Sequence, residues 1–160
     1  DGSSDDLLFK SGGVSGTERF RIIDTGGITF NGATGTDHAL DDYEEGTFSF
    51  NESNVSVSNY EAKFTKIGRI VMLSARIIFG SSSNTGTLNL TGLPFTPDSG
   101  AGNSTCGGVI PEQNVGLGAI FMAVEHGNNT VRIRKDNGAV CTPANVSGKS
   151  IRFVLWYIAT

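Results

Sequence analysis

The stretch KFTKIGRIVMLSARIIFG, from Lys63 to Gly80, decides the fold class. Apolar side chains recur at every second position on one of its faces, which comprises Ile67, Val71, Leu73, Ala75, Ile77 and Phe79. The other face mixes Ile70, Met72 and Ile78 with Lys66, Ser74 and Arg76. This alternation is typical of a β-strand that is buried on one side and partly exposed on the other. We therefore expect one long strand here.

Shorter alternating runs lie on both sides of this strand. They are GTFSF and NVSVSNY before it, and TLNL, VGLGAIFMAVE, TVRIRKD and KSIRFVLWYIAT after it. Turn-forming segments separate them, including the DNG at Asp136 to Gly138 and a long loop rich in Pro, Gly, Ser and Asn over residues 91–108. Roughly eight strands at this spacing predict an all-β fold, an antiparallel β-sandwich or jelly-roll-like head.

The last of these runs is apolar on both faces. Phe153, Leu155 and Tyr157 lie on one face, whereas Val154, Trp156 and Ile158 lie on the other. One face of a sheet in a small antiparallel domain normally meets solvent, so this strand predicts that a second chain covers one of its faces. The alternative is a central strand beneath a large loop of the same chain.

Residues 1–37 form a Gly-rich segment of a different kind. GTERFRIIDTGGITFNG, from Gly16 to Gly32, alternates runs of about four residues with turns. Strands this short, with so little apolar material, cannot build a core alone. We expect a β-rich stalk that relies on neighbouring chains or on the following domain, then an acidic hinge over residues 38–47 and a globular head over residues 48–160.

The composition argues against several classes of protein. The chain of 160 residues fits one domain with a short extra segment, and its start at Asp1 without a Met is typical of a fragment or a processed product. A net charge of −4, with no basic cluster longer than RIRK at 132–135, argues against nucleic-acid binding. The most apolar run, FVLWYIA at 153–159, is too short for membrane insertion.

No arrangement of reactive side chains predicts catalysis, a metal or a cofactor. His38 and His126 have no partners at metal-binding spacing. Cys106 and Cys141 are too few for a disulfide scaffold, and both a single bridge and two free thiols stay open. Asn-x-Ser/Thr triplets occur at Asn51, Asn54, Asn89, Asn103, Asn128 and Asn145, either by chance or as glycan acceptors of a secreted protein.

The segment HALDDYEEG holds four acids, Asp41, Asp42, Glu44 and Glu45. They could form a carboxylate pair for glycoside hydrolysis, or bind a divalent cation. Alternatively, Asp41 or Asp42 caps one helical turn that ends at Gly46. We favour the helical turn, because a calcium-type loop needs more alternating ligands than this segment supplies.

Four segments together resemble the C-terminal domain of bacteriophage tail fibre and receptor-binding proteins, a group common in viruses of marine bacteria. They are HALDDYEEGTFSF, YEAKFTKIGRIVMLSARI, LTGLPFTP and the terminal IRFVLWYIAT. The upstream GTERFRIIDTGGITFNG is similar to repeats that form an intertwined shaft before this domain, so the resemblance extends from about Gly16 to Thr160. Phe48 and Phe64 depart from the pattern, which usually has Trp and Tyr there, yet both keep an aromatic ring.

The resemblance implies a homotrimer with a slender intertwined stalk and a globular head. It implies a virion protein of the tail fibre, made in the host cytoplasm and extracellular when it acts. Such a protein is not an enzyme, and it binds a bacterial surface glycan or an outer-membrane component. Specificity is expected in the loops, where the first candidates are Asp98, Asn103, Glu125, His126, Asn128 and Asn137.

Three rival functions remain open at this stage. A polysaccharide depolymerase would need two facing acids at roughly 5 to 9.5 Å, and Asp98 with Glu125 is the pair to test. A capsid decoration or trimerisation knob would have no ligand. A secreted trimeric jelly roll of an animal would carry glycans on the Asn triplets.

Overall fold

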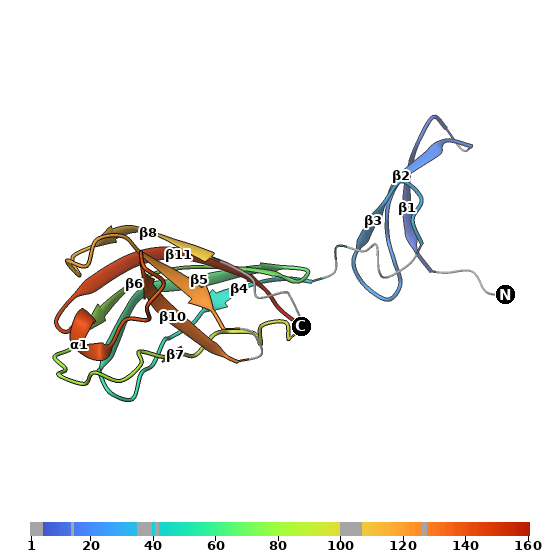
Figure 1. Cartoon of the computed structure of the whole chain (residues 1–160). Coiled ribbons are helices and arrows are strands. Elements are labelled where there is room, and N and C mark those ends of the chain that lie inside the picture. Colours follow the sequence, from blue (N-terminus) through green and yellow to red (C-terminus); the bar gives the residue numbers. More distant parts are fainter. Residues whose placement is uncertain (1–4, 14, 35–39, 41, 100–106, 126–127) are drawn as a thin grey trace. The chain divides into compact units, whose positions relative to one another are not determined.

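The computed structural model describes residues 5–13, 15–34, 40, 42–99, 107–125 and 128–160. The chain divides into two compact units, Asp1–Tyr43 and Glu44–Thr160, which we call the N-terminal unit and the head. Strands β1 to β3 belong to the N-terminal unit, and the head holds β5 to β11, most of β4 and one short helix (Figure 1).

The N-terminal unit is a small antiparallel sheet in the order β1-β2-β3. Its strands are β1 (Leu7–Ser11), β2 (Thr17–Ile22) and β3 (Ile28–Phe30). The rings of Phe9 and Phe20 stack with centroids 4.1 Å apart. These runs therefore form strands separated by turns, as the alternation in the sequence predicts.

The N-terminal unit has almost no core of its own. Among its described residues only Ile23 and Thr29 are buried, whereas large apolar side chains such as Leu7 and Phe30 are more than half exposed. Arg21 forms ion pairs with Asp6 and Glu18, and the hydrogen bond from Arg21 lowers the pKa of Glu18. These polar contacts do not replace a hydrophobic core, so the sheet buries too little apolar surface to be stable alone.

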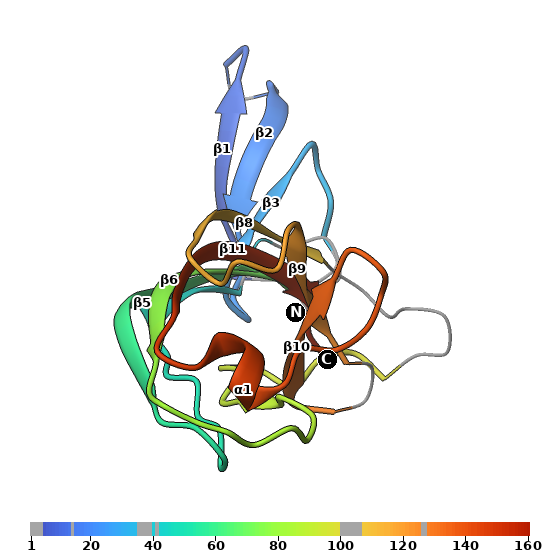
Figure 2. The ribbon, with the colours of Figure 1, turned by 60° about the vertical axis from the view of Figure 1, so that its left-hand side comes forward.

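The head is a single eight-stranded sheet in the order β4-β5-β6-β11-β8-β9-β10-β7. Its strands are β4 (Tyr43–Thr47), β5 (Val57–Ile67), β6 (Ile70–Phe79), β7 (Leu90–Thr91), β8 (Gly107–Gln113), β9 (Ile120–Val124), β10 (Thr130–Lys135) and β11 (Ser150–Ile158). The predicted all-β, antiparallel class is confirmed. The strands do not separate into two sheets; instead the one sheet curls and encloses a sandwich-like interior (Figure 2). The jelly-roll connectivity stays a prediction.

Backbone hydrogen bonds join the two edges of this curled sheet. Asn51, which follows edge strand β4, exchanges two hydrogen bonds of 2.9 Å with Thr91 of edge strand β7. The neighbouring Gly92 has a φ of +107°, and a Cβ there would lie 2.1 Å from the carbonyl oxygen of Ser49. Only glycine fits at position 92, so Gly92 allows the two edges of the sheet to approach each other.

One hydrophobic core fills the interior of the head. Its fully buried large side chains come from many strands and loops: Phe50, Val71, Leu73, Ile77, Phe79, Leu88, Leu90, Met122, Ile133, Ile151, Leu155 and Tyr157. The prediction that Leu88 and Leu90 point inward is confirmed. Cys141 also lies in this core as a free thiol, and burial raises its pKa. Cys106 lies outside the described residues.

The single long strand predicted over residues 63–80 is wrong, because this stretch belongs to a hairpin. β5 ends at Ile67, β6 begins at Ile70, and Gly68 in the turn has a φ of +55°. In β5 even-numbered residues such as Ala62 and Lys66 point inward, whereas in β6 the odd-numbered residues do. The buried ammonium of Lys66 is 3.6 Å from Glu44 and lies over the ring of Phe95. The sequence did not reveal this change, because a charged residue such as Lys66 is expected on the outer face.

The predicted helical turn in the acidic segment is also wrong. Residues 43–47 form strand β4, and Asp41 lies outside the described residues. Gly46 does not end a helix: a Cβ at this position would lie 2.6 Å from the ring of Phe64, so glycine lets the ring pack onto the strand. Tertiary packing thus outweighs the local preference for a turn.

Two elements lie where the sequence indicated only loops. β8 contains Pro111 at the point where its pairing with β11 shifts register. A regular backbone hydrogen bond between the strands is not needed there, so the missing N–H of proline is tolerated. The helix α1 (Pro143–Val146) is capped by Thr142 and Asn145, whose side chains each accept the other's backbone N–H. The DNG turn is confirmed, because Gly138 has a φ of +80°.

Tyr157→Phe is expected to destabilise the head by about 1 to 3 kcal/mol. The buried Tyr157 hydroxyl accepts the Phe95 N–H at 3.2 Å and donates to the Phe95 carbonyl at 3.0 Å, so the variant leaves two backbone groups without a partner. Burial also raises the pKa of Tyr157 from 10.0 to about 12.

The raised pKa adds a pH dependence to this variant. The unfolded chain loses the Tyr157 proton near pH 10 and the folded chain only near 12, so this contribution to stability is complete below pH 10 and falls as the pH rises toward 12. Urea unfolding across this range measures it. Tyr157→Phe should flatten the curve; equal slopes for wild type and variant would contradict the expectation.

Candidate functional site

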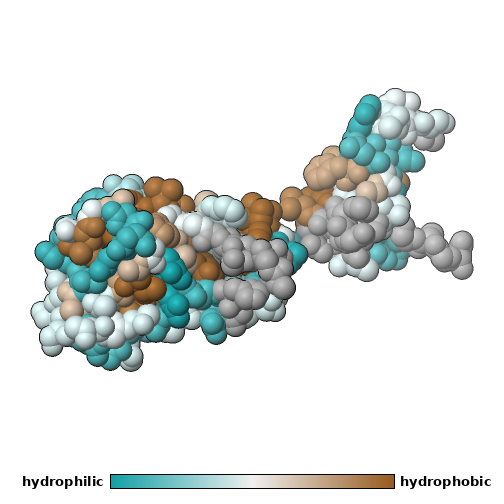
Figure 3. Space-filling view, in the orientation of Figure 1, coloured by the Kyte–Doolittle hydropathy of each residue, from teal (hydrophilic) through white to brown (hydrophobic). Residues whose placement is uncertain are grey.

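An apolar patch covers part of the outer face of the head, on the side of the sheet opposite the core. We call it the outer apolar patch, and it comprises Ile67, Ile70, Met72, Val109, Val154 and Trp156, each at least 41% exposed. Met72 pairs with Trp156 across β6 and β11, and Val154 pairs with Val109 across β11 and β8. Apolar areas also interrupt the hydrophilic surface of the head in Figure 3.

The patch follows from the two apolar faces of β11. Ile151, Phe153, Leu155 and Tyr157 point into the core, so the alternate residues must point outward. A contiguous patch of this kind on a small domain marks an interaction surface. In the single chain Trp156 is 51% exposed.

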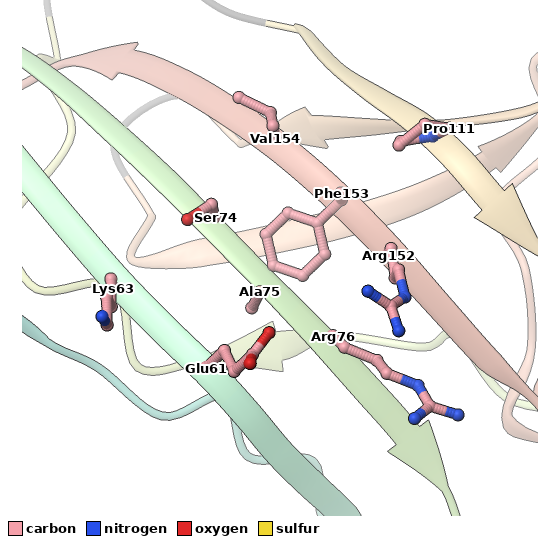
Figure 4. Close-up of a pocket in the computed structure, with 9 residues that line it drawn as sticks. All are labelled: Glu61, Lys63, Ser74, Ala75, Arg76, Pro111, Arg152, Phe153 and Val154. Carbon is pink, nitrogen blue, oxygen red and sulfur yellow. The ribbon is translucent and has the colours of Figure 1, made fainter.

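Next to the patch on the same outer face lies a charged hollow of about 480 Å³, which we call the arginine hollow. Arg76 of β6 and Arg152 of β11 are register partners in it, and Glu61 and Lys63 of β5 lie on its other side (Figure 4). The cationic Arg152 is 3.0 Å from Glu112 of β8, and both side chains are at least half exposed. The hollow therefore gathers three cations in an acidic protein.

A second hollow, of about 380 Å³, has only polar side chains in its lining. It is formed by Asn51, Glu52, Ser53, Asn54, Asn89 and Thr91. Glu52 is held in place by backbone N–H groups of Asn54 and Val55, and Asn89 accepts a hydrogen bond from Arg132. Ordered amide and carboxylate groups of this kind suit hydroxyl-rich ligands.

The two acids selected from the sequence are both engaged by arginines. Asp98 forms an ion pair with Arg69. Glu125 lies 3.3 Å from Arg132 and 2.9 Å from Arg134. Each carboxylate therefore already binds a cation of the chain.

Of the remaining loop candidates, two are described by the structure. Asn128 is exposed, and its N–H donates to the carbonyl of Glu125. Asn137 is exposed in the turn after β10, where its side chain accepts the N–H of Ala139. Asn103 and His126 lie outside the described residues. Glu125 and Asn128 are thus brought together, whereas Asn137 belongs to another turn.

Sequence reasoning missed both hollows. The arginine hollow joins residues from β5, β6, β8 and β11. Its only local signal in the sequence was the presence of polar residues such as Ser74 and Arg76 on one face of the stretch 63–80. The polar hollow was visible only as Asn-x-Ser/Thr triplets at Asn51, Asn54 and Asn89. Pairing between distant strands creates both sites, and no local pattern reports it.

Two further searches gave negative results within the part of the chain that the structure describes. No group of three or more His, Cys, Asp or Glu side chains there could hold a metal ion. No helix in the described ranges is long and apolar enough to cross a membrane.

The chain was compared with known proteins in three ways. A scan against protein-family models, a search among curated proteins and a search among solved structures each find no match.

Proposed function

We propose that this chain is the tip domain of a bacteriophage tail fibre, a homotrimer that binds a glycan on the host cell surface without cleaving it. It would act outside the cell as part of the virion, after synthesis in the host cytoplasm. The observation that carries the proposal is the outer apolar patch. It includes the outward residues of β11, and the opposite face of β11 is buried in the core.

The trimer explains why the patch is apolar. Met72 and Trp156 expose about half of their surface in the single chain, which is costly in water unless a partner covers them. Two further copies of the same chain offer the same apolar surface, so a closed ring of three buries it without any other partner.

The N-terminal unit gives independent support. Its exposed Leu7, Phe9 and Phe30 surround a sheet with almost no core. A unit of this kind gains stability when three copies wrap around one another, as in an intertwined shaft. The sequence resemblance points to the same arrangement.

Receptor binding is assigned to the loops and the polar hollow. Asn128 and Asn137 are exposed, and the polar hollow adds a site that hydrogen-bonds hydroxyl groups. A trimer multiplies a weak site threefold, so avidity can hold a virus on a cell without one tight pocket. The depolymerase alternative is less favoured, because Asp98 and Glu125 are held by arginines.

The test measures mass and binding in one experiment. The purified 160-residue protein is sized by light scattering and exposed to a panel of bacterial cells and their extracted surface polysaccharides. We expect a trimer that binds one glycan class and leaves its length unchanged. Asn128→Ala should weaken binding, while Asn129→Ala serves as the neighbouring control.

Other results would identify the rival functions. A monomer would contradict the fibre assignment, and a shortened glycan would favour the depolymerase. A trimer that binds no member of the panel would favour a capsid decoration or a trimerisation knob.

A further inference from the structure

The arginine hollow contains an arrangement of charge that the chain itself leaves uncompensated. Arg76 and Arg152 are directly opposite on neighbouring strands, and like charges in that position repel each other. Arg152 has a partner in Glu112, but Arg76 makes no ion pair with any described residue. The pair is therefore stable only at a free-energy cost, unless a negative group lies between the two guanidinium groups.

The buried donor of Arg76 strengthens this argument. Its Nε is buried, and among the described residues nothing accepts its hydrogen. A buried N–H without an acceptor is costly and rare in native proteins. Two oxygens of a carboxylate, sulfate or phosphate group can accept from Nε and a terminal nitrogen of one arginine at once, which is the geometry that guanidinium prefers.

A bulge in β5 shapes the opposite wall of the hollow. The pairing of β5 with β6 shifts register between Tyr60 and Lys63, and Glu61 within this bulge has a φ of +51°. Bulges re-aim side chains and are frequent beside functional sites. Figure 4 shows Glu61 turned toward β6, facing the side from which Arg76 and Arg152 extend.

The balance of charges defines the ligand. Lys63, Arg76 and Arg152 supply three positive charges against two negative charges, one from Glu61 and one from Glu112 beside Arg152, in a chain whose net charge is −4. Glu61 and the hydroxyl of Ser74 can accept hydrogen bonds from hydroxyl groups beside the anionic centre.

We infer that the arginine hollow binds a carboxylate, sulfate or phosphate group carried on a hydroxyl-rich molecule, with Arg76 and Arg152 holding the anion and Glu61 and Ser74 the hydroxyl groups. This inference rests on the geometry of the head alone and is independent of the proposed function. Pro111 gives the hollow an apolar rim against which the carbon skeleton of such a molecule packs.

The first experiment titrates the 160-residue protein by calorimetry at low ionic strength with sodium glucuronate, sodium sulfate and glucose. We expect saturable binding of both anions, tighter for glucuronate, and none for glucose. Equal affinity for glucuronate and sulfate would overturn the role given to Glu61 and Ser74. An absence of saturable anion binding would overturn the whole inference.

Matched variants locate the binding. Arg76→Gln and Arg152→Gln should each weaken glucuronate binding roughly tenfold, because each removes a charge-assisted hydrogen bond. Arg152 is exposed enough that its variant should fold even if Arg76→Gln does not. Glu61→Gln should tighten sulfate binding, since it removes a repelling charge. Lys10→Gln in β1 makes the same charge change as the arginine variants at a residue that does not line the hollow, and it should have no effect.

The oligomeric state separates a ligand site from a contact between copies. Light scattering on the same samples should give one mass for wild type and Arg152→Gln. A lower mass for Arg152→Gln, combined with no anion binding by wild type, would mean that an acid of a second copy fills the hollow, and the inference would be wrong.

Discussion

Replacing Trp156 by glutamate is expected to convert the proposed trimer into folded monomers. Trp156 is about half exposed in the outer apolar patch, beside Met72, and its side chain takes no part in the core. A buried aromatic residue at the centre of an interface commonly accounts for about 2 kcal/mol or more of binding free energy per protomer. The glutamate adds an unpaired charge to a surface that must lose its water.

Size-exclusion chromatography with light scattering measures this result. The wild type should elute as a trimer and Trp156→Glu as a monomer with unchanged circular dichroism. Thr85→Glu adds the same charge in an exposed loop and should remain trimeric. A trimeric Trp156→Glu protein would show that the patch is not the interface between copies.

Replacing the adjacent Leu155 by alanine is expected to destabilise the fold of each chain, whereas Trp156→Glu acts on the contact between chains. Leu155 is fully buried in the core, so its truncation should lower the free energy of unfolding by about 2 to 5 kcal/mol. The loss combines the transfer free energy of the removed carbons with the cavity that remains. It acts on the fold of each chain rather than on the contact between chains.

Urea unfolding in the Trp156→Glu background measures this loss without a contribution from assembly. Val154→Ala is the control, because Val154 is 41% exposed on the outer face and should cost less than about 1 kcal/mol. Similar losses for Leu155→Ala and Val154→Ala would mean that the two faces of β11 are assigned the wrong way round.

The hairpin of β5 and β6 shows where sequence reasoning reached its limit. Ile67 shares the odd-numbered positions of Val71 and Leu73, so the pattern is typical of one strand. Two strands joined by a two-residue turn give the same local signal as one long strand. Only the pairing of Ile67 with Ile70 distinguishes them, and pairing is a tertiary property.

β4 and β8 were missed for a related reason. Gly46 and Pro111 weaken the local preference for a strand, yet the neighbouring strands accommodate both residues. Phe64 packs where a side chain at Gly46 would be, and the register shift beside Pro111 removes the need for its missing donor. Local preference argues against these strands, and contacts with distant residues decide in their favour.

The sequence by itself determined the all-β class, the poverty of the N-terminal unit in core residues and the two apolar faces of β11, because each depends on the local periodicity of side chains. It also led us to expect a second chain on one of those faces. The tertiary structure alone decided that Leu155 points inward and Trp156 outward, and that Arg76 and Arg152 meet beside Glu61. These outcomes depend on strand order and register, which arise from pairing between residues far apart in the chain and leave no local pattern in the sequence.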